Sequence, residues 1–95
     1  MTQDIHSHEV ELTQYLMPHG KKRKTYVPVG EEYVGKAKKR DLVFSCEILS
    51  TGELAIYAKK RGDSEEEEKV GLAHNGPGGL NPTEVLRNLI DEFED

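Results

Sequence analysis

The sequence predicts an α+β domain in which a five-stranded, mostly antiparallel sheet carries two helices on one face, in the order ββαβββα. Three observations support this fold class. Apolar and polar side chains alternate over residues 9–16, 41–49 and 54–58, as they do in half-buried strands. Residues 82–93 instead carry apolar side chains at helical spacing. Turn-forming sequences separate successive strands, which favours hairpins and antiparallel pairing.

The length of 95 residues is that of one domain with a modest core. Residues 1–8 show no apolar period, so we expect a flexible N-terminal tail and a single α+β domain over residues 9–95. No apolar run approaches the roughly 20 residues of a membrane-spanning helix, and the first residues lack the apolar stretch of a signal peptide. Cys46 is the only cysteine, which fits a reducing compartment. We therefore expect a cytoplasmic protein without membrane contact.

Residues 9–16 and 21–29 are predicted to form the first hairpin. In the first strand, Val10, Leu12 and Leu16 share one face. The intervening MPHG sequence offers a proline that can begin a turn and a glycine that can take a positive φ.

The second strand of this hairpin begins with four consecutive cationic side chains at residues 21–24. Successive side chains of a strand point to opposite faces, so no core can cover this segment on either side. Its first half is therefore expected to project beyond the packed sheet as the exposed tip of a β-ribbon. Only Tyr26, Val27 and Val29 have a reason to be buried.

A short helix is predicted over residues 31–40. Glu31 and Glu32 stand at its start and basic residues at its end, an order that complements the helix dipole. The apolar stripe is narrow and consists of Tyr33, Val34 and Ala37.

The strongest hairpin signal lies in residues 41–49 and 54–58, which are joined by a turn at residues 50–53. A polar connection with four consecutive glutamates follows, and residues 69–73 make a short fifth strand.

The last helix is predicted to begin after Asn81, which acts as the N-cap. Pro82 occupies the first helical position, and Glu84 stands three places after the cap. The predicted core combines this helix with the inward positions of the strands. It consists of Val10, Leu12, Phe44, Cys46, Ile48, Leu54, Ile56, Leu86, Leu89, Ile90 and Phe93.

Charge is divided between the two parts of the chain. Residues 1–40 hold eight Lys and Arg against five Asp and Glu, a balance of +3, and residues 41–95 hold five against thirteen, a balance of −8. Such asymmetry marks either an interaction surface or the solvated faces of one sheet. The candidate interaction surface is the set of clustered bases Lys21, Lys22, Arg23, Lys24, Lys36, Lys38, Lys39 and Arg40.

Nucleic-acid binding is one interpretation of these clustered basic residues. Clustered cations at a ribbon tip or a helix end can contact phosphates, and Tyr26 and Tyr33 could stack on unpaired bases. Against this, the net charge is −5, whereas dedicated nucleic-acid binders are strongly basic. The sequence also lacks a helix-turn-helix spacing and the aromatic signature of an RNA-recognition motif.

Other chemistry has little support. Four histidines and Cys46 could ligate zinc, but His6 and His8 lie on the expected tail and Cys46 on an apolar strand face. The glycine-rich loop at residues 74–82 precedes a helix, as anion-binding loops do, yet it lacks the lysine and hydroxyl of a P-loop. No serine stands in a recognisable nucleophile setting.

The sequence therefore favours a small non-enzymatic binding or accessory module that acts through a charged surface on a protein partner. Self-association is one form of this function, because the basic ribbon and the acidic segment are complementary. No cofactor and no metal are expected. The alternative is nucleic-acid binding through the ribbon tip and the end of the first helix, and the third class is a small enzyme or anion-binding domain built on residues 74–82.

Overall fold

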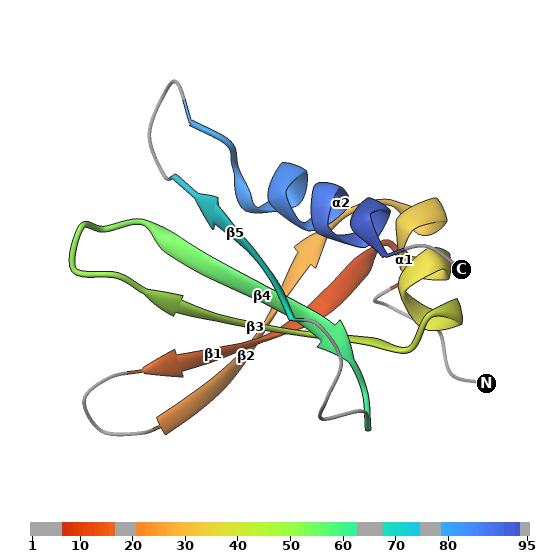
Figure 1. Ribbon diagram of the computed structural model, residues 1–95, viewed down its shortest axis with the longest axis horizontal. Coiled ribbons are helices and arrows are strands. Elements are labelled where there is room, and N and C mark those ends of the chain that lie inside the picture. The colour runs from red at the N-terminus through yellow and green to blue at the C-terminus, as the bar shows by residue number, and fades with distance from the viewer. Residues whose placement is uncertain (1–6, 17–20, 63–67, 75–78, 94–95) are drawn as a thin grey trace.

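A computed structural model describes residues 7–16, 21–62, 68–74 and 79–93. Its elements are β1 (Glu9–Leu16), β2 (Lys21–Pro28), α1 (Glu31–Lys39), β3 (Leu42–Ile48), β4 (Leu54–Lys60), β5 (Lys69–Ala73) and α2 (Pro82–Glu92) (Figure 1). The α+β class and the order ββαβββα are confirmed. The first turn, at residues 17–20, and most of the expected tail lie outside the described residues, so those two features stay predictions.

The five strands form one mixed sheet in the order β2-β1-β3-β4-β5. Three neighbouring pairs are antiparallel, whereas β1 and β3 are parallel, with Leu12 opposite Phe44. The parallel pair follows from the chain path. Because β2 ends where β1 begins, α1 delivers the chain to that same end of the sheet, and β3 then runs in the direction of β1.

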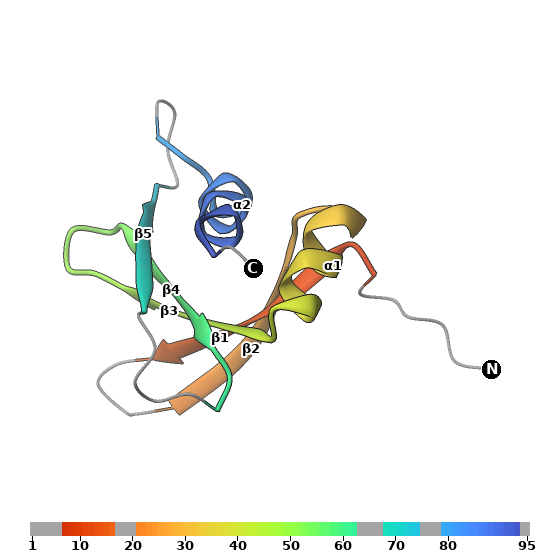
Figure 2. The same cartoon turned by 45° about the vertical axis from the view of Figure 1, so that its right-hand side comes forward.

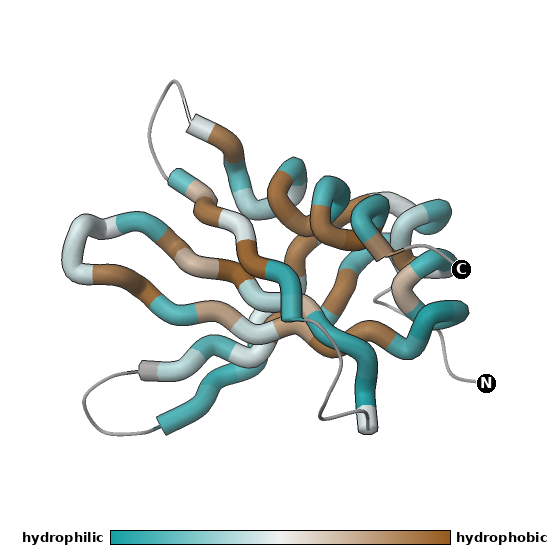
Figure 3. Tube along the Cα trace, viewed as in Figure 1, coloured by the Kyte–Doolittle hydropathy of each residue, from teal (hydrophilic) through white to brown (hydrophobic). Residues whose placement is uncertain are grey.

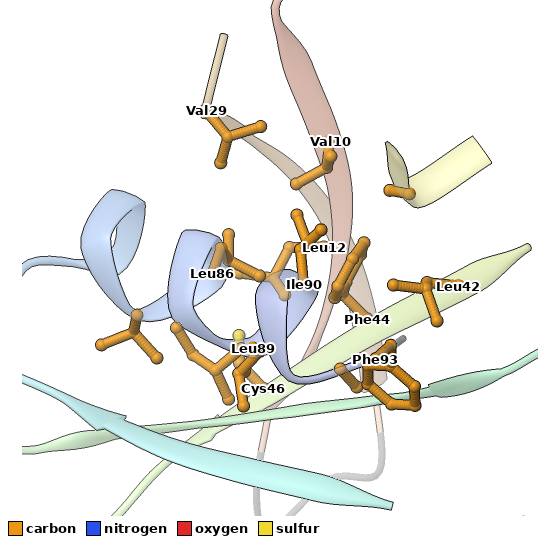
Figure 4. Close-up of a cluster of buried hydrophobic side chains, with 14 of the residues drawn as sticks. Val10, Leu12, Val29, Leu42, Phe44, Cys46, Leu86, Leu89, Ile90 and Phe93 are labelled. Atoms are coloured by element: carbon orange, nitrogen blue, oxygen red, sulfur yellow. The ribbon is translucent and has the colours of Figure 1, made fainter. Parts of the chain in front are cut away.

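Both helices cover the same face of the twisted sheet (Figures 1 and 2). Apolar residues alternate with polar ones along the strands and recur along α2, as the hydropathy colouring shows (Figure 3). On α2, the side chains of Val85, Leu86, Leu89 and Ile90 are buried. They meet Leu12, Phe44 and Cys46 of the sheet in one continuous cluster (Figure 4).

Gly71 lets α2 approach β5 closely. A Cβ atom at this position would lie only 2.6 Å from Cγ1 of Val85, well inside van der Waals contact. The glycine on β5 therefore fixes how near the helix lies to this side of the sheet.

Hydrogen bonds from residues distant in sequence hold α1 in place. The backbone amides of Val29 and Gly30 both donate to the carbonyl of His8, at 2.8 and 2.9 Å. The Tyr33 hydroxyl donates to Oδ2 of Asp91 on α2 at 3.0 Å, and Nε of Arg87 donates to the Val29 carbonyl at 3.1 Å. The start of α1 is thereby tied both to β1 and to α2.

Most of the predicted core is buried, with two differences. Leu54 is only partly buried, and Ile48 is 59% exposed, so the prediction for Ile48 is wrong. Ile48 and Leu54 form the last pair of the β3–β4 ladder, at the end of the hairpin. The alternation placed Ile48 on the correct face but could not indicate where helix cover stops.

The expectation for Tyr26 is also wrong. Its side chain is 36% exposed, because it points to the face that carries no helix. On the helix side of β2, Val27 pairs with Val10 and packs against the core. The buried polar residue Gln14 occupies the inward position after Leu12 on β1.

Among the residues that the structure describes, neither helix is both long enough and apolar enough to cross a membrane.

The core residues Phe44 and Leu89 generate a first prediction. Replacing either by Ala is expected to lower the free energy of unfolding by roughly 2–5 kcal/mol, because each truncation leaves a cavity in a close-packed layer. Urea unfolding monitored by circular dichroism measures the change. Ile48→Ala is the matched control and should cost far less, since its side chain is largely exposed. Equal losses for Ile48→Ala and Leu89→Ala would contradict the packing described.

The N-cap of α2 generates a second prediction. Oδ1 of Asn81 accepts a hydrogen bond from the backbone amide of Glu84 at 2.9 Å, which confirms the predicted cap. Asn81→Ala should lower the free energy of unfolding by about 1 kcal/mol, and Asn81→Asp should largely retain it, because a carboxylate can accept the same bond. Thermal and urea unfolding of both variants test this, and an unchanged Asn81→Ala variant would count against the cap.

Candidate functional site

The face of the sheet opposite the helices is the candidate binding surface. No described helix or strand covers it (Figure 2). We call this surface the open face. Its outward-pointing residues are Glu9, Glu11, Thr13 and Tyr15 of β1, Lys22, Lys24, Tyr26 and Pro28 of β2, Val43, Ser45 and Glu47 of β3, Ala55, Tyr57 and Lys59 of β4, and Val70 and Leu72 of β5.

Tyrosine side chains are concentrated on the open face. Three of the four tyrosines, Tyr15, Tyr26 and Tyr57, lie on it. Tyr15 is 40% exposed and Tyr57 is half-buried. A tyrosine combines a large apolar ring with a polar hydroxyl. It is therefore suited to binding surfaces that are exposed to solvent in the free protein and buried in the complex.

The β5 side of the open face is apolar. Val70 and Leu72 are 57% and 46% exposed and stand on the same side of one strand. Their neighbours on β4 are Tyr57 and Ala55, and Ala55 is already buried beneath them. Contiguous exposed apolar surface marks interaction sites, and these two side chains are candidates for part of one.

Two hollows run along the parallel pair β1–β3 on this face. The first has a volume of about 420 Å³ and lies between Tyr15 and Tyr57. The second, of about 490 Å³, extends toward α1 and reaches Val34 and Ala37. Thr13, Val43 and Phe44 line both hollows, so the two join into one shallow groove.

The second hollow has a structural cause. The β1–β3 ladder begins only at Leu12 and Phe44, so the preceding residues of the two strands are not paired with each other. The strands separate at this end, and the side chains of α1 form the floor of the gap.

Charges on the open face are arranged in local pairs. Nζ of Lys24 lies 3.7 Å from a carboxylate oxygen of Glu11, and Nζ of Lys22 lies 5.6 Å from the centre of the Tyr15 ring. On the other side of the groove, the Tyr57 hydroxyl donates to Glu47 at 2.8 Å. This bond raises the pKa of Tyr57, and burial and the negative charges of Glu47 and Glu68 raise that pKa further.

The basic run at residues 21–24 divides as strand geometry requires. All four side chains are exposed, in agreement with the predicted ribbon. Lys22 and Lys24 lie on the open face, whereas Lys21 and Arg23 point to the helix side. There, Arg23 donates to Oε1 of Gln14 at 3.0 Å.

The second basic group lies on α1, away from this run. Nζ of Lys36 lies 3.7 Å from Glu32 and 3.5 Å from Asp91, and Lys38 lines the second hollow. Arg40 donates to the Ile90 carbonyl at 3.5 Å, and Lys39 is exposed on the last turn.

The two basic groups do not form one patch. The run begins β2, α1 follows the end of that strand, and eight residues of strand span on the order of 25 Å. Figure 1 shows the start of β2 and α1 at opposite ends of the molecule.

The other candidate ligands do not gather either. Within residues 7–16, 21–62, 68–74 and 79–93, no three His, Cys, Asp or Glu side chains are arranged to hold a metal ion. Cys46 faces the core, and burial raises the pKa of its thiol, an effect that Arg23 partly offsets. The middle of the glycine-rich loop, residues 75–78, lies outside the described residues, so its anion-binding role stays untested.

The open face was not identified from the sequence, although signals for it were present. Tyr15, Tyr57, Val70 and Leu72 stand at the outward positions of alternating strands, where polar residues are the rule. An aromatic or aliphatic residue repeated at such positions indicates a strand face that contacts something else.

A scan of protein-family models, a search of curated proteins and a search of solved structures each found no match for this chain.

Proposed function

We propose that the protein is a non-enzymatic binding module that contacts a protein partner through the open face of its sheet. The observation that carries this proposal is the composition of that face, which presents three tyrosines and two exposed aliphatic side chains that no described element covers. Tyrosine is enriched at protein interfaces, and contiguous exposed apolar surface marks binding sites.

This proposal shifts the contact surface away from the eight basic residues. Those residues lie at two separate places, and several of them are already engaged with acids or carbonyl groups of the same chain. Lys22 and Lys24 remain part of the site, at the β2 margin of the open face.

The charge balance of the open face favours a protein over a polyanion. Its lysines are Lys22, Lys24 and Lys59, and its carboxylates are Glu9, Glu11, Glu47 and, at the rim of the first hollow, Glu68, so three positive charges meet four negative ones. The carboxylates would repel a polyanion that the lysines attract. A protein surface with mixed charges around apolar contacts complements such a face.

Two further features fit a non-enzymatic binding module of the cytosol. The only cysteine, Cys46, is free and buried, as expected for a protein of a reducing compartment. The carboxylates of Glu11 and Glu47 accept hydrogen bonds from Tyr26 and Tyr57, which is a structural use of these groups rather than acid–base chemistry.

Single-stranded nucleic acid is the second candidate ligand, and one observation favours it. Tyr15 and Tyr26 lie beside Lys22 and Lys24 on the β1–β2 half of the open face. Rings for stacking next to cations for phosphates are the two components of a single-strand platform.

The first test removes aromatic surface from the open face. Tyr15→Ser/Tyr26→Ser should lower affinity for the partner by about tenfold or more, since exposed aromatic anchors dominate interface energies. Immobilised wild-type and variant proteins are exposed to a lysate of the source organism, and quantitative mass spectrometry measures the proteins retained.

The control is Asn88→Ser/Glu92→Gln, two exposed positions on α2 away from the open face. Both variants are first shown to unfold at the wild-type temperature. The proposal predicts proteins that wild type and control retain alike and the tyrosine variant loses. Equal retention by all three, or retention of nothing specific by wild type, would overturn it.

The second test titrates labelled single-stranded and duplex DNA and RNA at several salt concentrations. We expect binding no tighter than the non-specific range of about 10⁻⁴–10⁻⁶ M, because only two of the four cations in the run share a face and carboxylates stand among them. Lys22→Glu/Lys24→Glu is the control. Sub-micromolar affinity at physiological salt that disappears in this variant would make nucleic-acid binding the better proposal.

A further inference from the structure

The two edges of the sheet differ in chemistry. β2 forms one edge and carries four cationic side chains and Pro28. Lysine and proline on an edge strand hinder hydrogen-bonded pairing with another chain. The basic run is therefore well suited to keep this edge unpaired, which gives it a role that requires no ligand.

β5 forms the opposite edge and lacks such protection between Val70 and Leu72, although the backbone amide of His74, just after the strand, already donates to the Leu80 carbonyl at 2.8 Å. Its sequence is Lys-Val-Gly-Leu-Ala, and Lys69 places its Nζ 5.3 Å from the centre of the Phe93 ring on the helix side. Val70 and Leu72 remain exposed on the open face. Within the described part of the chain, β4 is the only strand that pairs with β5.

We infer that β5 pairs antiparallel with β5 of a second copy of this chain, about a two-fold axis at Gly71. An antiparallel pair of identical strands is isologous and closes as a dimer. The axis places Gly71 opposite the partner's Gly71, and Val70 opposite the partner's Leu72. Each edge then supplies the backbone donors and acceptors that the other lacks.

The side chains of β5 are complementary to themselves in this register. Val70 and Leu72 of each copy form one apolar stripe across the new strand pair, continued on both sides by Tyr57 and Ala55. Aliphatic pairs directly opposite each other stabilise antiparallel strands. The strand pair ends at His74, because the backbone amide of this residue already donates to the Leu80 carbonyl at 2.8 Å and its side chain lies 2.8 Å from a carboxylate oxygen of Glu53.

The dimer deepens the proposed function and rests on it in one respect, namely that Val70 and Leu72 belong to the open face. A two-fold axis perpendicular to the sheet leaves both open faces on the same side and both α2 helices on the other. The result is a continuous ten-stranded sheet, because each copy contributes five strands. Two partner-binding surfaces side by side would bind a repeated or dimeric partner with added avidity.

The test measures mass in solution by analytical ultracentrifugation over a wide range of protein concentration. Wild type is expected to approach twice the 10.7 kDa mass of one chain as the concentration rises. Val70→Lys/Leu72→Lys places lysines opposite lysines across the axis and should raise the dimer dissociation constant by roughly 100-fold or more. Val70→Glu/Leu72→Lys pairs each acid with the partner's base and should restore much of the dimer.

Ile48→Lys is the control, because it places a lysine at an equally exposed aliphatic position away from β5 and should leave the dimer unchanged. All variants are compared with wild type by circular dichroism, so that loss of the fold is separated from loss of the dimer. Wild type that stays monomeric, or a dimer that the double lysine variant leaves intact, would overturn the inference.

The lysate experiment separates the two proposals. A monomeric wild type that retains partners lost by Tyr15→Ser/Tyr26→Ser would overturn the dimer and support the open face. A dimer that retains no specific protein would do the reverse.

Discussion

The packing of α2 against the sheet is the interaction on which the rest of the structure depends. The apolar stripe of this helix meets the inward side chains of the strands, and Gly71 allows contact close enough to exclude a methyl group at that position. Burial of this kind supplies most of the free energy that offsets chain entropy in a small domain. A chain of 95 residues has enough apolar material for one such layer. Among the residues that the structure describes, no helix or strand covers the second face of the sheet, and this is the face that we propose for binding.

A polar junction between the two helices fixes how the layer is arranged. Tyr33 and Lys36 on α1 both contact Asp91 on α2, and Arg87 reaches back to the Val29 carbonyl. The bond to Asp91 raises the pKa of Tyr33, so the tyrosine keeps its proton and remains a donor. Exposed ion pairs such as these contribute little energy each, but they are directional. Their effect is to fix the position of α1, and α1 in turn sets the end of the sheet from which β3 begins.

Local sequence patterns were sufficient to predict each helix and strand that the structure describes, the α+β class and the cap of α2. They could not predict the parallel pairing of β1 with β3, because alternation identifies the face of a side chain and not the neighbouring strand. They also failed for Ile48 and Tyr26, since burial depends on where a helix ends and which face it covers. The candidate site was missed for a related reason. The four cations at residues 21–24 stand out in the sequence, whereas the open face is assembled from five strands and becomes visible only when their register is known.

Apolar and charged side chains are distributed unequally over the two faces and two edges of the sheet. The surfaces that we propose for binding follow from this distribution. One face is filled by helices, and one edge carries lysines and a proline that discourage pairing. The remaining face and the remaining edge meet at β5, where Val70 and Leu72 are exposed. Association through β5 and contact through the open face are the two uses that we propose for these side chains.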